Sequence, residues 1–94
     1  MTHPIITTAS GYGFCPTGNG SLERSLFQVS PDIPIGDAMA NVSVLLGTLH
    51  SSLTETALGN RTITSDDAFV MAHTLRSAKA VIDALAPGME SRTE

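Results

Sequence analysis

The side chains of this sequence that are able to do catalytic or metal chemistry are few and scattered. The thiol and imidazole groups of the chain are those of Cys15, His3, His50 and His73. A thiol beside an imidazole can act as a nucleophile with its base, and three or four such ligands can hold zinc, but both need a cluster of groups. The spacing of these residues provides no cluster. We therefore expect no metal, no cofactor and no catalytic residue, and predict that the protein is not an enzyme.

Two further features have a structural explanation instead of a chemical one. The carboxylates of Asp66 and Asp67 are adjacent, so on a helix they diverge by about 100° and do not face one site. Residues 18–21 are rich in glycine, but they lack the Gly-Lys-Ser/Thr ending of a phosphate-binding loop and follow no strand. We interpret the aspartates as a helix start and the glycine-rich stretch as linker.

Composition excludes two classes of partner. Five Lys and Arg residues against nine Asp and Glu residues give a net charge of -4, the wrong sign for nucleic-acid binding driven by electrostatics. No window approaches the roughly 18 uninterrupted apolar residues of a membrane span. One cysteine and the lack of a signal-peptide pattern favour a reducing compartment. We expect no nucleic acid, no membrane and a cytoplasmic location.

The elements that must position these side chains are two helices. Pro34 suits the first helical position and Gly59 with Asn60 suits a helix end, which predicts a helix over residues 34–58. A start at Thr64 or Ser65 and a stop at Pro87 predict a second helix over 65–86. Apolar residues are spaced by four and three along both: Ile35, Met39, Val42, Leu46, Leu49, Leu53, then Ala68, Met71, Leu75, Ala78, Ile82, Leu85. The short connection makes the helices an antiparallel hairpin, with His73 on its outward face and His50 at the seam's edge.

The segments outside the helices contain less regular pattern. Residues 1–22 are interpreted as a flexible arm, 23–86 as the hairpin domain and 87–94 as a flexible tail. A short strand is predicted over 26–29, where Leu26, Phe27 and Val29 have no partner strand in this chain, so they pack on the helices or pair with a second copy. The predicted fold class is all-α.

The apolar face of this hairpin is too wide for one helix partner, because further apolar residues flank both seams. We predict a homodimeric four-helix bundle in which one hairpin covers the other. The alternative is a monomer whose arm folds back over the face. The predicted core and interface residues are Ile35, Met39, Val42, Leu45, Leu46, Leu49, Leu53, Phe69, Met71, Leu75, Ala78, Ile82 and Leu85.

A longer pattern runs through residues 26–85. It comprises Leu26-Phe27, Val29, Pro31, Ile33-Pro34, Asp37-Ala38, Leu45-Leu46, Ala72-His73, Leu75 and Ala78-Lys79-Ala80-Val81-Ile82. In these residues the chain resembles a family of small bacterial proteins classed as a domain of unknown function. It departs at Gly36, where such proteins commonly have a polar residue. The resemblance implies no activity, cofactor or catalytic residue.

Three functional hypotheses follow. The first is a non-enzymatic helical module that dimerises and binds a protein partner. The second is a small regulatory or inhibitor-type protein, such as an antitoxin-like, anti-activator or phage-type protein, that captures one partner; an acidic charge assists binding to a basic one. The third is a small enzyme with His50 or His73 at the dimer interface.

Overall fold

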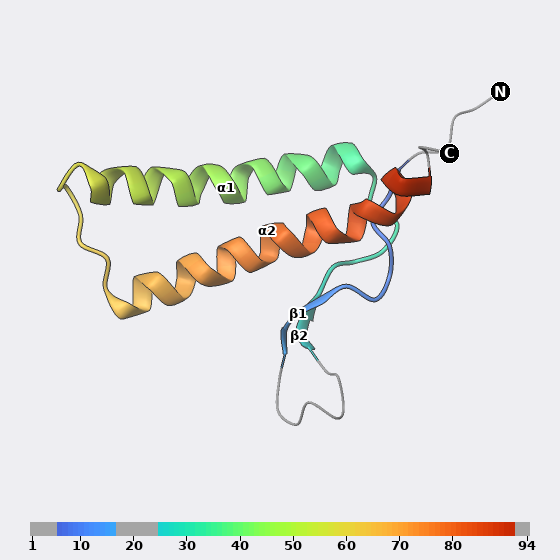
Figure 1. The fold of residues 1–94 in the computed structure, drawn as a ribbon, viewed down its shortest axis with the longest axis horizontal. Coiled ribbons are helices and arrows are strands. Elements are labelled where there is room, and N and C mark those ends of the chain that lie inside the picture. The colour runs from blue at the N-terminus through green and yellow to red at the C-terminus, as the bar shows by residue number, and fades with distance from the viewer. Residues whose placement is uncertain (1–5, 17–24, 92–94) are drawn as a thin grey trace.

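The fold is a helical hairpin with a two-stranded sheet at its side (Figure 1). The computed structural model describes residues 6–16 and 25–91. In chain order the elements are β1 (Gly13–Pro16), β2 (Ser25–Gln28), α1 (Ile35–Ala57) and α2 (Ser65–Ser91). The predicted helical hairpin is therefore confirmed, and the sheet is added to it. Among the described residues, no helix combines the length and the apolar character needed to cross a membrane.

The C-terminus of α1 has the predicted glycine cap. Gly59 has a positive φ of 81°, a conformation that glycine adopts without steric cost. The Gly59 N–H donates to the Thr56 carbonyl at 3.1 Å, and the Asn60 N–H donates to the Glu55 carbonyl at 3.0 Å. This pair of bonds is a Schellman motif, which satisfies the last carbonyls of the helix.

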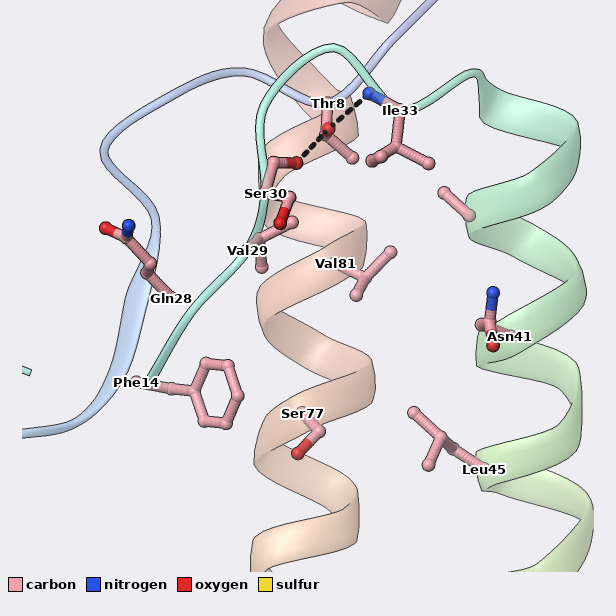
Figure 2. Close-up of a pocket in the computed structure, with 11 residues that line it drawn as sticks. Thr8, Phe14, Gln28, Val29, Ser30, Ile33, Asn41, Leu45, Ser77 and Val81 are labelled. Atoms are coloured by element: carbon pink, nitrogen blue, oxygen red, sulfur yellow. Dashed lines mark hydrogen bonds between the residues drawn. The ribbon is translucent and has the colours of Figure 1, made fainter. Parts of the chain in front are cut away.

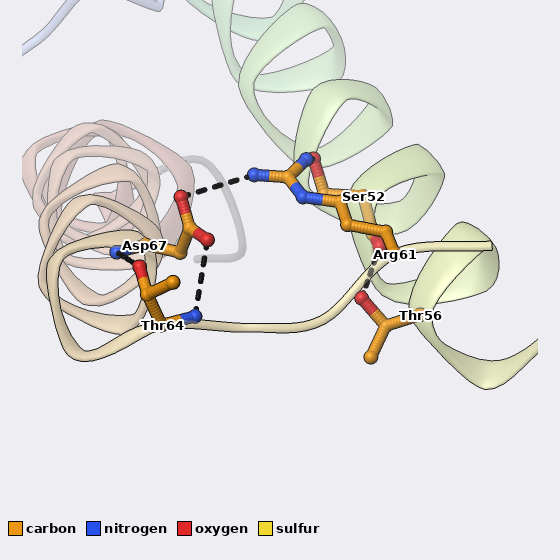
Figure 3. A network of polar contacts seen from close by, with 5 residues as sticks. All are labelled: Ser52, Thr56, Arg61, Thr64 and Asp67. Carbon is orange, nitrogen blue, oxygen red and sulfur yellow. Dashed lines mark hydrogen bonds and ion pairs between the residues drawn. The ribbon is translucent and has the colours of Figure 1, made fainter. Parts of the chain in front are cut away.

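The N-terminus of α2 is capped by Thr64, one of the two candidates. The Thr64 hydroxyl accepts from the Asp67 N–H at 3.1 Å, and the Thr64 N–H donates to the Asp67 carboxylate at 3.1 Å, a reciprocal capping box. Arg61 donates to Asp67 at 3.2 Å and to the Ser52 hydroxyl at 3.1 Å, which ties the connection to α1 (Figure 3). The Thr64 backbone N–H, followed by the Thr64 side chain and the Arg61 guanidinium, lowers the pKa of Asp67.

The predicted end of α2 is wrong, because the helix continues past Pro87 to Ser91. Proline removes one helical hydrogen bond, and contacts with the N-terminal segment accompany this last turn. The Ala9 N–H donates to the Ala84 carbonyl at 2.7 Å. Gly88 lies so close to Ile6 that a Cβ on it would be 3.2 Å from Ile6 Cγ2.

The N-terminal segment joins the open ends of both helices. The Thr8 hydroxyl donates to the Ser30 carbonyl at 2.6 Å and accepts from the Ile33 N–H at 3.0 Å. The Ile35 N–H donates to the Ile6 carbonyl at 2.7 Å, at the start of α1. The sequence predicted a flexible arm over 1–22; residues 6–16 make these contacts and form β1, whereas residues 1–5 and 17–22 lie outside the described part.

The strand predicted to lack a partner has one within the chain. β2 pairs antiparallel with β1, with Phe14 opposite Phe27 and their rings stacked at 5.4 Å. Gly13 allows this approach, because a Cβ there would lie 2.6 Å from the Ser25 hydroxyl oxygen. The prediction that this strand has no partner in the chain was wrong. β1 gives little signal in the sequence, because it is only four residues long and lies in the glycine-rich arm. Pairing of β2 with a second copy stays a prediction.

Small residues form most of the buried core. Among the described residues, the buried apolar side chains are Ala38, Val42, Ala78, Ala80, Ala84 and Leu85. Alanines let two helices approach closely, and they bury little area per residue. The hairpin therefore leaves most of its large apolar side chains partly or fully in contact with solvent.

Candidate functional site: an exposed apolar helix face

The predicted seam of α1 divides into two stripes. Val42 is buried and Leu49 is half-buried, both on the side of α1 that packs on α2. Met39, Leu46 and Leu53 are exposed instead, and they lie seven residues apart. Each of these three follows an inward residue by four positions, which on a helix of 3.6 residues per turn places it beside that residue.

The seam of α2 divides in the same way. Ala78 and Leu85 are buried against the rest of the hairpin. Leu75, Ile82 and Met89 are exposed and again lie seven residues apart, each four positions after an inward residue. Over the six residues of the two stripes, the exposed fraction of each residue runs from 39% to 52%.

Both stripes lie on the same side of the hairpin. In an antiparallel helix pair, side chains that follow an inward residue by the same number of positions lie on the same side of the plane through the two helix axes. Residues at an offset of three, such as Leu45 and Val81, line the cavity beneath the β strands, together with Phe14 (Figure 2). The residues at an offset of four therefore form the opposite side. We call this surface the heptad face; it comprises Met39, Leu46, Leu53, Leu75, Ile82 and Met89.

The heptad face contains five of the predicted interface residues and one that the sequence argument missed. The sequence pattern predicts that α2 stops at Pro87 and so excludes Met89, although Met89 continues the seven-residue spacing from Ile82. Two of the predicted residues lie neither on the heptad face nor on the inward side of a helix. Leu45 lines the cavity on the β side. Phe69 is exposed two positions before Met71, about 200° around the helix, so it points away from α1.

An ion pair lies near the rim of the heptad face. The Lys79 ammonium contacts the Asp83 carboxylate at 2.7 Å, both on the outer side of α2. The six side chains of the face itself are all apolar. A surface of this kind is suited to apolar contact with another protein and offers no group for acid–base or nucleophilic chemistry.

The predicted chemical residues are not brought together. His50 is exposed on α1. The prediction that His73 faces outward is wrong: it is half-buried on α2, and its ring lies 5.1 Å from that of Phe27 and 5.9 Å from that of Phe14. His3 lies outside the described residues, and the described ones contain no group of three or more potential metal ligands.

Comparison with known families finds a match over most of the chain. The family model described as "Protein of unknown function (DUF3077)" matches residues 10–87. The chain belongs to this family. The resemblance inferred over residues 26–85 is thus confirmed, and the match extends into the N-terminal segment. No curated protein and no solved structure matches the chain.

The extent of the family match agrees with the fold. Residues 10–87 include both strands and both helices as far as Pro87. Strand β1 therefore lies within the part of the chain that the family model matches. The family description itself names no activity, so the function has to be argued from the surface of the molecule.

Proposed function

We propose that this protein is a non-enzymatic interaction module that dimerises through the heptad face. The observation that supports the proposal is the pair of exposed apolar stripes on one side of the hairpin. Two hairpins placed face to face would form a four-helix bundle, in which the stripes become the central core. A surface used in this way by two identical copies has two-fold symmetry.

The size of the heptad face fits a dimer interface. Its exposed fractions, applied to roughly 200 Å² of accessible surface per large apolar residue, give about 550 Å² per copy. Two copies would together bury about 1,100 Å² of these side chains alone, close to the roughly 1,200 Å² at which stable protein interfaces begin. Alanines and other residues around the stripes add to this area.

The alternative of a monomer covered by its own arm accounts for the β side of the hairpin but not for the heptad face. Residues 6–16 lie on the β side of the hairpin and at its open end, where they bond to Ala84, Ile33 and Ile35. They leave the heptad face uncovered. The second hypothesis is that the same face captures a different protein. If the chain is a dimer, the second copy would have to dissociate before that protein could bind.

The enzyme hypothesis has little geometric support. His73 lies under the β strands, on the side opposite the heptad face, and His50 is exposed on α1. A catalytic site at the proposed interface would therefore have to use His50 without His73, and the six side chains of the heptad face offer it no acid–base or nucleophilic partner. We propose that neither histidine takes part in catalysis.

The proposal is tested by thermal unfolding at several protein concentrations, followed by circular dichroism. Dimer formation adds concentration-dependent stability, so a tenfold increase in protein raises the unfolding midpoint by about 3 to 4 °C. A midpoint that stays constant over a thousandfold range of concentration would show that the chain folds as a monomer and would refute the dimer.

A further inference from the structure

A cavity of about 330 Å³ lies on the β side of the hairpin (Figure 2). Its volume falls at the lower end of the range of small-molecule sites, roughly 300 to 1,000 Å³. Helix α2 forms the floor of the cavity and α1 forms one wall. The opposite wall is formed by β1 and by the chain that leaves β2. Because the heptad face is on the opposite side, the cavity stays open whether or not the chain dimerises.

The cavity has apolar walls. Phe14 from β1 and Val29 from the end of β2 lie across from Leu45 on α1, and Val81 of α2 lies between them. The second face of the Phe14 ring is already occupied by stacking on Phe27. This arrangement holds the Phe14 ring in place, so it can serve as a fixed wall for a compact apolar group.

The polar residues that line the cavity are Thr8, Gln28, Ser30, Asn41 and Ser77, and Asn41 and Ser77 present acceptors to it. The Asn41 amide donates to the Asp37 carbonyl at 3.0 Å, which leaves its side-chain oxygen without a hydrogen bond from the described residues. The Ser77 hydroxyl donates to the His73 carbonyl at 2.8 Å, so the lone pairs of the Ser77 oxygen can still accept a hydrogen bond. The Thr8 hydroxyl donates and accepts within the fold. The Asn41 oxygen and the Ser77 hydroxyl can therefore accept hydrogen bonds from a ligand that carries a donor.

Two acidic residues adjoin the cavity lining in sequence. Asp37 lies one turn before Asn41 on α1, and Asp32 precedes the lining residue Ile33; both aspartates are exposed. Within residues 6–16 and 25–91, no Lys or Arg lines the cavity. Arg76 adjoins Ser77 in sequence but is turned about 100° from it on α2. With a net charge of -4 on the chain, the field at this site favours a cation.

We propose that this cavity binds a small organic cation: a compact apolar body with a protonated amine. The apolar body lies between Phe14 and Leu45. The amine lies on the α1 side of the cavity, where it donates to the Asn41 side-chain oxygen and is attracted by the Asp37 carboxylate. The site is independent of the dimer, so the failure of one proposal leaves the other standing.

Three probes that share an indole ring test the charge preference: tryptamine, indole and indole-3-acetate. Each is titrated into the full-length ¹⁵N-labelled chain, and the amide shifts are recorded by NMR. By Coulomb's law, a carboxylate about 7 Å from a bound amine raises the affinity for the cation about threefold in water, so we expect tryptamine to bind at least about threefold tighter than indole. Indole-3-acetate binds more weakly than indole. The shifts centre on Asn41, Leu45 and Ser77.

Three variants locate the site. Ser77→Leu fills the cavity and weakens tryptamine binding at least about tenfold, whereas Ser51→Leu, the same change on the exposed side of α1, leaves it unaltered. Asp37→Asn weakens tryptamine about threefold and leaves indole unaltered. Equal affinity for the three probes, or shifts centred on the heptad face, would overturn the proposal. If Ser77→Leu fails to fold, the conservative surface change Asp37→Asn decides the matter.

Discussion

A charge in the middle of the heptad face should separate the proposed dimer without unfolding the hairpin. Leu46 is the central residue of the α1 stripe, and 39% of it is exposed in the single chain. Applied to roughly 200 Å² of surface, this fraction corresponds to about 80 Å² per copy, or about 160 Å² per dimer. At about 25 cal/mol per Å², Leu46→Asp removes about 4 kcal/mol of association free energy, which is about 1,000-fold in the dissociation constant. Burial of two carboxylates weakens the dimer further.

The assay is sedimentation velocity over a series of concentrations, with circular dichroism to verify that the helices remain. Val44→Asp is the matched control, because Val44 is 68% exposed and lies two positions from Val42 and from Leu46, on the outer side of α1. We expect Leu46→Asp to sediment as a monomer and Val44→Asp to sediment like the wild type. If Leu46→Asp remains dimeric, or if both variants dissociate equally, the heptad face is not the interface.

The remaining predictions concern the stability of the fold, and denaturant unfolding measures each of them. Thr8 is only 2% exposed, so Thr8→Val leaves the Ser30 carbonyl and the Ile33 N–H without their hydrogen-bond partner and costs about 1 to 3 kcal/mol of unfolding free energy. An unchanged midpoint would show that the N-terminal segment does not hold the helix ends. Thr64→Ala removes the α2 cap and costs about 0.5 to 2 kcal/mol. Because the folded state lowers the pKa of Asp67 from its ordinary 3.8, its contribution to stability is present above that pH and is lost as pH falls below it; Asp67→Asn should remove this part of the acid dependence. Gly47→Ala meets open space on a helix and stabilises by about 0.5 to 1 kcal/mol, whereas Gly13→Ala forces the two strands apart and destabilises by about 1 to 3 kcal/mol; the reverse order of the two would contradict the described backbone.

The helices and their ends at the connection could be predicted because local signals determine them. Gly59 supplies the left-handed conformation that ends α1, and Thr64 with Asp67 supplies the capping box that begins α2. Both depend on residues within a few positions of one another. The antiparallel hairpin follows from the shortness of the connection between them.

The extension of α2 and the partner of β2 could not be predicted, because both depend on contacts distant in sequence. Pro87 ends a helix by local rules, but Gly88 packs on Ile6 from the other end of the chain. β1 has only four residues, and Pro16, its last, lacks an N–H. The sequence does contain one signal for this pairing: the two aromatic residues Phe14 and Phe27, whose rings stack in the structure.

The heptad pattern predicted the right residue types and merged two different roles. Val42 and Leu46 belong to one apolar seam in the sequence, yet one packs within the hairpin and the other is exposed. The offset of three or four from an inward residue separates the β side from the heptad face, and only the position of the N-terminal segment shows which of the two is covered. The sequence therefore predicts how wide the apolar surface is, and the structure shows which part of it is free.

The central claim is that a second copy of this chain covers the heptad face. Multi-angle light scattering after size exclusion, at micromolar concentration, measures the molar mass in solution directly. We predict a mass of twice the 9.8 kDa of one chain, with Leu46→Asp at the mass of one chain. A wild-type mass of 9.8 kDa at every concentration would contradict the claim.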